Sequence, residues 1–186
     1  EGLQQSKSVL HGELTGPVNA ALNGVSFNID LMEGHKTGTY LDQQINHALV
    51  ANHCADKRVL DCFTFQGGFA LHAAKAGASE VLGLDQSEEA LTQARANALA
   101  NDLKATFEQS NVFDWLKKNS GKEAREFDVV ILDPPSFTRN RASVPDALRG
   151  YKEIHLRALR LLPPSGLLAT FCCSHHVDDD LFLDPI

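Results

Sequence analysis

The strongest constraint in this chain is a regular alternation of short apolar runs and amphipathic stretches from Arg58 onward. The apolar runs have the length of buried strands, and the stretches between them carry apolar residues at helical spacing. Such an alternation is typical of a doubly wound α/β fold with a mostly parallel sheet. We expect strands at Val59–Phe63, Val81–Leu84, Ala105–Glu108, Val129–Leu132 and Leu167–Phe171, and helices at Gly68–Ala76, Ser87–Asn101, Val112–Asn119 and Gly150–Leu162.

The first part of the chain has a different pattern and indicates a small extension before this fold. Val25–Leu31 alternates apolar and polar residues, and Asn23-Gly24 before it is a strong hairpin signal. After a polar loop, apolar residues at helical spacing predict a helix over Leu41–Ala55. We therefore expect an N-terminal linker and hairpin in residues 1–40 and one α/β domain in residues 41–186.

Composition excludes several classes of protein. The 186 residues are 43% hydrophobic, yet they contain no run of about 18 apolar residues that could cross a membrane. The N-terminus lacks the basic and apolar regions of a secretory signal, so we expect a cytoplasmic protein. The formal charge of -7 argues against a large nonspecific nucleic-acid surface but allows a local basic strip.

Polar residues follow three successive expected strands, at the edge where α/β sheets bind ligands. Gly67-Gly68 permits a tight turn at a helix N-terminus, although the strict G-x-G-x-x-G pattern is absent. Asp85 ends the second strand, where a carboxylate can accept hydrogen bonds from both hydroxyls of a ribose. Asn111 and Val112 follow the third strand and would face the amino group and the ring of an adenine.

Each of these residues also has an ordinary structural explanation, as a turn, a helix N-cap or a loop residue. Their occurrence together at successive strand ends favours an adenosine-containing cofactor. A nicotinamide dinucleotide is disfavoured, because its pyrophosphate needs the full glycine pattern.

The fourth expected strand ends in the rigid loop Asp133-Pro134-Pro135-Ser136-Phe137. Prolines stiffen such a loop and direct a carboxylate and backbone carbonyls above the sheet. Phe137 is placed there to stack on a planar base. A simple turn after a strand is the alternative explanation.

The fifth expected strand leads into Cys172-Cys173 at the same edge of the sheet. Because successive side chains of a strand alternate between its faces, we expect only Cys173 to reach the site. A buried structural cysteine is the alternative, and we assign it to Cys62. His175-His176 beside these cysteines does not form a metal site, since contiguous residues cannot converge on one tetrahedral centre.

These motifs resemble the bacterial 23S rRNA cytosine-5 methyltransferases of the large-subunit type, within the class I S-adenosylmethionine-dependent methyltransferases. The matching segments are Gly34–Gln43, Val59–Phe63 with Gly67–Ala70, Asp133–Phe137, Arg149–Lys152 and Phe171–Ser174. The resemblance implies a Rossmann-like methyltransferase domain, S-adenosylmethionine as cofactor and a nucleophilic Cys173. The implied cofactor-binding residues are Phe63, Gln66, Gly67, Gly68, Asp85, Gln86, Asn111, Val112 and Asp133.

The sequence departs from the family pattern in several places. Ser136 and Gln44 stand where the family usually has Lys and Arg, so two cations near the target are absent. Full-length members also carry an N-terminal RNA-binding domain and two further C-terminal strands. We therefore expect either a fragment of a longer protein or a shortened homologue. In both cases the fifth strand would be a sheet edge, which favours a homodimer or another cover for that edge.

Three hypotheses follow for the function. The leading one is methyl transfer to C5 of a cytosine in ribosomal RNA, with Cys173 as nucleophile and Asp133 holding the protonated ring nitrogen. The second is methylation of a base nitrogen with Cys173 structural, and the third is a module that binds the cofactor or RNA without turnover. The expected RNA-contacting residues are Lys36, Pro134, Pro135, Phe137, Arg149 and Lys152, with Arg139 and Arg141 at the rim.

Overall fold

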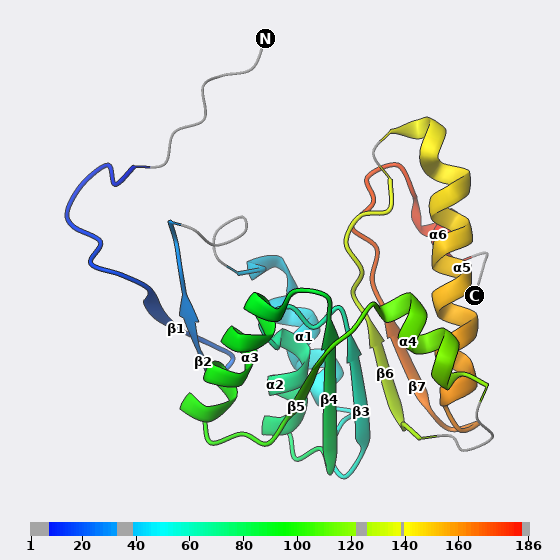
Figure 1. Ribbon diagram of the computed structural model, residues 1–186, viewed down its shortest axis with the longest axis horizontal. Helices are drawn as coiled ribbons and strands as arrows, with labels where there is room; N and C mark the ends of the chain where they lie inside the picture. The colour runs from blue at the N-terminus through cyan, green and yellow to red at the C-terminus, as the bar shows by residue number, and fades with distance from the viewer. Residues whose placement is uncertain (1–7, 33–38, 122–125, 139, 184–186) are drawn as a thin grey trace.

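The computed structural model describes residues 8–32, 39–121, 126–138 and 140–183. It shows a hairpin beside one sheet that is flanked by helices (Figure 1). The elements are β1 (Val18–Leu22), β2 (Val25–Ile29), η1 (Leu41–Gln43), α1 (Gln44–Ala51), β3 (Arg58–Cys62), α2 (Gly68–Lys75), β4 (Glu80–Asp85), α3 (Glu88–Ala100), β5 (Thr106–Gln109), α4 (Val112–Asn119), β6 (Val129–Leu132), η2 (Arg141–Ser143), α5 (Val144–Leu161), β7 (Leu167–Thr170) and α6 (Asp179–Leu183).

Five of these strands form one parallel sheet in the order β5-β4-β3-β6-β7. The chain builds outward from β3 to β5 and then returns to add β6 on the other side of β3. Such a reversal opens a crevice at the carboxyl ends of the two central strands, where doubly wound proteins bind ligands. The expected α/β class is confirmed, and the loops after β3 and β6 flank this crevice.

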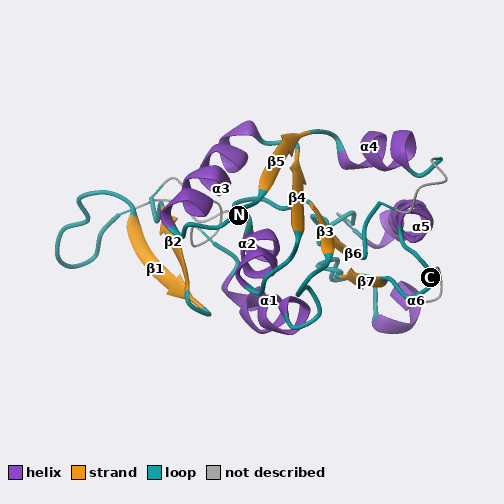
Figure 2. Cartoon of the chain, turned by 90° about the horizontal axis from the view of Figure 1, so that it is seen from below, coloured by secondary structure: helices purple, strands orange, loops and turns teal. Residues whose placement is uncertain are grey.

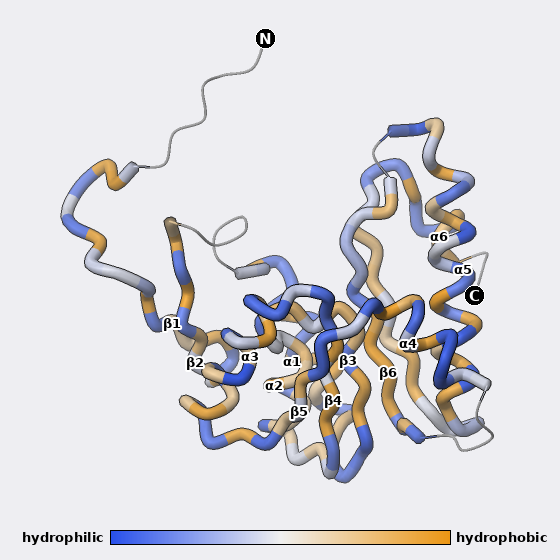
Figure 3. The backbone as a smooth tube through the Cα atoms, in the orientation of Figure 1, coloured by the Kyte–Doolittle hydropathy of each residue, from blue (hydrophilic) through white to orange (hydrophobic). Residues whose placement is uncertain are grey.

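Helices cover both faces of the sheet (Figure 2), because its strand residues alternate between two apolar clusters. Val59 and Val129 pack in one cluster with α2 and α3. Leu60 and Val130, their neighbours along the strands, pack in the other cluster with α4 and α5. The central strand β6 is accordingly hydrophobic along its whole length in Figure 3, as a strand buried on both faces must be.

The expected hairpin is present as β1 and β2, apart from the main sheet. Asn23 and Gly24 have φ angles of 47° and 75°, the left-handed values that a two-residue hairpin turn needs. The hairpin docks on α3 through Asn101, whose side chain accepts from Ser26 N at 2.8 Å and donates to Ser26 O at 2.7 Å. A helix side chain thus replaces a neighbouring strand at this edge of β2.

Two helices differ from the sequence expectation. α5 begins at Val144 and not at Gly150, because Pro145 lies in the first turn, where its missing N–H costs no helical hydrogen bond. The helix expected over Leu41–Ala55 is a 3₁₀ turn followed by α1, which ends at Ala51.

Three further properties of the described residues concern membrane-spanning helices, metal-binding clusters and disulfides. In the described ranges, no helix is long and apolar enough to cross a membrane. Nor do three or more His, Cys, Asp or Glu side chains of those ranges gather where they could hold a metal ion. All four cysteines are free thiols.

Candidate functional site

The loop from β3 to α2 has an unusual backbone at the carboxyl edge of the sheet. Phe63, Phe65 and Gly67 have φ angles of 64°, 51° and 86°, and only the glycine adopts such a value without steric cost. A Cβ on Gly67 would also crowd side chains of α2 and β5, and a Cβ on Gly68 would lie 2.8 Å from His47 Nε2. The two glycines therefore let the loop turn tightly into the N-terminus of α2, where backbone N–H groups have no helical partner.

Asp61 lies beneath this loop and is fully buried. Its Oδ2 accepts hydrogen bonds from Thr64 Oγ1 at 2.5 Å and Ala70 N at 2.9 Å. Burial raises the pKa of Asp61 to about 7, and these hydrogen bonds lower it only in part. Its Oδ1, and likewise the buried Oε1 of Gln66, have no hydrogen-bond partner among the residues that the structure describes.

Asp85 ends β4 and faces the same loop. Its Oδ2 accepts from Phe65 N and its Oδ1 from Ser87 N, each at 2.9 Å. Ser87 is the N-cap of α3, as expected, since its Oγ accepts from Ala90 N at 3.1 Å. Two backbone donors thus fix the carboxylate at the strand end, and one of them belongs to the glycine loop.

The loop after β5 carries the residues expected to meet the adenine. Asn111 is exposed and caps α4, with its Oδ1 accepting from Asp114 N at 3.2 Å. Val112 is 1% exposed and packs inside the core. Gln86 is exposed on the neighbouring loop, and its carbonyl accepts from Gln109 Nε2 at 3.0 Å.

Asp133 comes directly after β6, the strand that pairs with β3 on the side away from β4. Its Oδ1 accepts a hydrogen bond from Gln43 Nε2 at 3.1 Å. Tyr40 packs its ring against the edge of Phe65 with 5.4 Å between ring centroids. The pKa of Tyr40 is raised, first by burial and then by the nearby charges of Asp133 and Cys173. The segment before α1 therefore passes over the site and contacts both sides of it.

The two adjacent cysteines lie on opposite sides of the chain after β7, as expected. Cys173 is exposed, and its Sγ lies 3.5 Å from Pro134 O. Cys172 is half-buried, and its Sγ donates to Tyr151 Oη at 3.3 Å. Only Cys173 thus contacts the rigid loop that begins at Asp133.

The residues expected to hold the substrate are dispersed around this loop. Pro134 is buried and Pro135 is exposed. The ring of Phe137 packs against Tyr151 and Phe113, with centroids 4.6 and 5.7 Å away. Its stacking on a target base stays a prediction.

Two of the expected basic residues lie on one exposed face of α5. Arg149 and Lys152 are three residues apart, and Arg149 forms an ion pair with Asp146. Lys36 and Arg139 lie outside the described residues.

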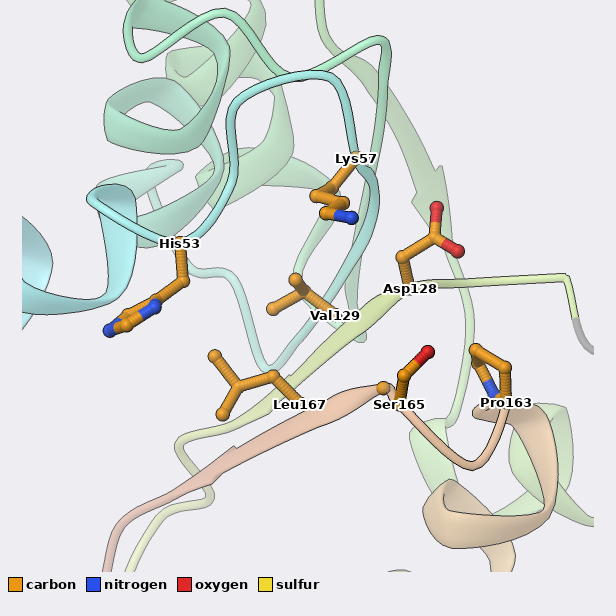
Figure 4. Close-up of a pocket in the computed structure, with 8 residues that line it drawn as sticks. His53, Lys57, Asp128, Val129, Pro163, Ser165 and Leu167 are labelled. Carbon is orange, nitrogen blue, oxygen red and sulfur yellow. The ribbon is translucent and has the colours of Figure 1, made fainter.

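A pocket of about 300 Å³ opens at the opposite, amino edge of the sheet (Figure 4). Its lining includes Lys57 before β3, Asp128 before β6 and Leu167 at the start of β7. The Asp128 carboxylate is bound by the backbone and side chain of Arg58. Ligands of doubly wound folds bind at the other edge, so we do not assign the function to this pocket.

A family model for S-adenosylmethionine-dependent methyltransferases matches residues 5–185 of the chain. The chain belongs to this family.

Relatives of this methyltransferase include proteins named ribosomal RNA large subunit methyltransferase I. The relative from Aeromonas salmonicida is 44% identical over 186 residues, and the relative from Tolumonas auensis is 42% identical over 189 residues. Each match covers 98% of this chain and 47% of the relative. The chain therefore spans about half the length of these curated relatives.

Solved structures of methyltransferases share the fold. One that is complexed with SAH matches with a TM-score of 0.83 and 27% identity, over 96% of this chain and 47% of its own. A SAM-dependent methyltransferase from Streptococcus mutans matches with a TM-score of 0.81 and 25% identity, with the same coverage.

The described residues of this methyltransferase fit the cofactor of its family. The loop at Gly67 and Gly68 leads into the N-terminus of α2, whose first backbone N–H groups are donors of the kind that bind anionic groups. The buried Oδ1 of Asp61 lacks a donor among the described residues, and a buried polar atom without a partner is costly. The cationic amino group of a bound S-adenosylmethionine is a donor of the kind that this oxygen needs.

Sequence reasoning missed three residues of the methyltransferase site. Asp61 stands within a buried strand, and a carboxylate in an apolar run is a signal that was available. Tyr40 and Gln43 were part of a matched motif, but their distance from Asp133 in the sequence hides their contact with the crevice.

Proposed function

We propose that this chain carries the methyl-transfer site of an enzyme that methylates C5 of a cytosine in large-subunit ribosomal RNA. The names of the relatives support the RNA class, and the arrangement of Cys173 and Asp133 supports the base and the position. Because ribosomal RNA is made and modified in the bacterial cytoplasm, we place the activity there.

S-adenosylmethionine, when bound, supplies an electrophilic methyl group. We assign the ribose hydroxyls to Asp85 with Gln86 beside it, and the adenine to Asn111. The expected contact of Val112 with the adenine ring is not retained, because Val112 is buried in the core. The methionine moiety is assigned to the loop Phe63–Gly68, with Asp61 accepting from its amino group. These assignments follow the order of the strand ends along the carboxyl edge.

Cytosine C5 is a weak nucleophile, so methylation there needs covalent activation. We propose that the Cys173 thiolate adds to C6, which gives C5 enamine character and lets it take the methyl group. Loss of the C5 proton to a base and departure of the thiolate then restore the aromatic ring. Asp133 accepts the hydrogen bond from the protonated ring nitrogen and so favours the addition.

The observation that carries this proposal is the position of the Cys173 thiol. It is exposed at the carboxyl edge, and its Sγ lies 3.5 Å from Pro134 O in the loop that Asp133 begins. A cysteine with only a structural role would be expected in the core, as Cys62 is.

The proposal also assigns the residues that contact the RNA. Pro134, Pro135 and Phe137 would form the wall beside the flipped base, and Arg149 and Lys152 would contact phosphates. A homodimer is a further prediction, because β7 pairs only with β6 among the described strands and so presents an edge. Light scattering in solution measures the molar mass and so distinguishes a monomer from a dimer.

Transfer of labelled methyl groups to undermodified ribosomal RNA tests the proposal. The wild type and Cys173→Ala are compared, and the product is digested to nucleosides. We expect 5-methylcytidine from the wild type and at least a thousandfold lower rate from the variant, about the size expected for losing a nucleophile.

The variant must bind S-adenosylmethionine as the wild type does, which calorimetry shows independently of turnover. A methylated base nitrogen, or activity that survives in Cys173→Ala, would replace this proposal with nitrogen methylation. Binding without turnover in the wild type would leave a binding module.

A further inference from the structure

A hydrogen-bond network joins the loop after β6 to the loop after β7, beside the proposed nucleophile, and runs from the buried Tyr151 to the exposed Ser136. Its centre is Ser174, which is 3% exposed. The Ser174 Oγ lies 2.9 Å from Tyr151 Oη, 3.1 Å from Ser136 Oγ and 3.2 Å from Phe137 N, which donates to it. The network continues to Cys172, whose Sγ donates to Tyr151 Oη at 3.3 Å.

The direction of every hydrogen bond in this network follows from proton counting. Ser136 gives its hydroxyl proton to Thr138 O at 3.1 Å, so it can only accept from Ser174. Ser174 has then used its one proton and accepts from Tyr151. Tyr151 in turn accepts from the Cys172 thiol. The four groups form one ordered chain, in which each bond polarises the next.

Cys172 is hydrogen-bonded to this network, whereas the neighbouring Cys173 is not part of it. Cys172 is engaged as a hydrogen-bond donor to Tyr151 Oη. Cys173 points to the other side, toward Pro134 O. Ser174 also accepts from Phe137 N, so the loop after β7 is held against the loop that carries Asp133.

We propose that the Tyr151–Ser174–Ser136 network selects Cys173 over Cys172 as the reactive thiol and fixes its position against the Asp133 loop. Tyr151 and Ser174 are thus positioning residues, and this role rests on the proposed function. Ser136 completes the network, because its Oγ contacts both Ser174 Oγ and Thr138 O.

Thiol alkylation tests the selection without RNA or cofactor. Cys172→Ser and Cys173→Ser each leave one of the two thiols, while Cys54 and Cys62 are buried. The rates of reaction with iodoacetamide then give the preference for Cys173. Because exposure alone favours Cys173, the decisive comparison adds Tyr151→Phe to both backgrounds. Tyr151→Phe removes one hydrogen bond from Cys172, so we expect the ratio of the Cys173 rate to the Cys172 rate to fall by about tenfold.

Kinetics test the positioning. We expect Tyr151→Phe and Ser174→Ala to lower kcat by about tenfold or more while KM for S-adenosylmethionine stays the same. Ser120→Ala is the matched control, because Ser120 is also buried but lies at the end of α4, away from the network. Thermal unfolding and cofactor binding confirm that each variant is folded.

An unchanged thiol preference together with an unchanged kcat in Tyr151→Phe would overturn the proposal. A loss of kcat that comes with equal loss of cofactor binding would assign the network to fold stability alone and would also overturn it. The alkylation preference is independent of methylation. It therefore separates failure of this inference from failure of the cytosine-5 mechanism.

Discussion

At the scale of single residues, Asp61 is the group whose chemistry depends most on folding. Its pKa is about 7 in the folded chain, chiefly because of burial, whereas an unfolded aspartate has a pKa of about 3.9. An acid whose pKa rises on folding stabilises the folded state below the unfolded value. That contribution is lost as pH rises toward the folded value.

We therefore expect the free energy of unfolding of the cofactor-free chain to fall between about pH 4 and pH 7, by up to about 4 kcal/mol at 1.36 kcal/mol per pKa unit. Asp61→Asn keeps an acceptor for Thr64 and Ala70 but does not ionise, so it should flatten this dependence. Urea unfolding of the wild type and of Asp61→Asn at about pH 5 and about pH 7.5 measures how the free energy of unfolding of each depends on pH.

The same variant should bind S-adenosylmethionine more weakly, because a neutral amide replaces the proposed acceptor of the amino group. Asp56→Asn is the matched control, since it makes the same change on an exposed residue. A pH dependence in Asp61→Asn as steep as in the wild type would contradict the role of this carboxyl.

The residue scale also shows what the sequence could predict of the site. Asp85, Asn111, Asp133 and Cys173 follow strands, and the positions of strand ends can be read from apolar runs. Tyr40 could not be assigned in this way, because its neighbours in the site are far away in the sequence.

At the scale of elements, α4 links stability to the cofactor site through its N-cap. The Oδ1 of Asn111 accepts from Asp114 N, and the same side chain is proposed to meet the adenine. We expect Asn111→Ala to lower the free energy of unfolding by about 1 kcal/mol, the usual value for an N-cap. It should also weaken cofactor binding.

Asn111→Asp retains both roles, because it keeps an oxygen that can cap the helix and accept from an adenine amino group. Its stability and affinity should lie nearer to the wild type. Ser87→Ala is the control, since it removes an equivalent cap from α3. Denaturation and calorimetry measure both effects, and equal affinity loss in Asn111→Ala and Ser87→Ala would contradict a direct contact.

Sequence patterns predicted most elements because strands and helices here have clear periods. They placed the start of α5 six residues late, at Gly150, since Pro145 was not recognised as part of a first turn. No expectation covered α6, whose five residues are too few for a helical period.

At the scale of the whole molecule, local patterns define the sheet but not what packs against it. The alternation of strands and helices predicted the parallel sheet, because each crossover is local in sequence. The docking of the hairpin on α3 depends on Asn101, a residue that reads as an ordinary polar position at the end of a helix. Such long-range contacts have no periodic signal.

Charge is the other property of the whole molecule, and it governs how the chain meets RNA. The formal charge is -7, because 24 Asp and Glu outnumber 17 Lys and Arg, so acidic side chains oppose phosphate binding outside a local basic strip. We therefore expect weak RNA binding with a shallow salt dependence. Each phosphate contact contributes about −0.7 to the slope of log K against log salt for single strands.

Arg149→Ala and Lys152→Ala should each reduce the steepness of that slope by about 0.7 if both residues contact phosphate. The effect of Arg149 should be the smaller, because Asp146 competes with phosphate for its guanidinium. Lys117→Ala is the control, since Lys117 is exposed in the last turn of α4. Fluorescence anisotropy of a labelled ribosomal RNA fragment across a potassium chloride series gives the slopes. If Lys117→Ala changed the slope as much as Lys152→Ala, the RNA would bind through diffuse charge and not through the exposed face of α5 that carries Arg149 and Lys152.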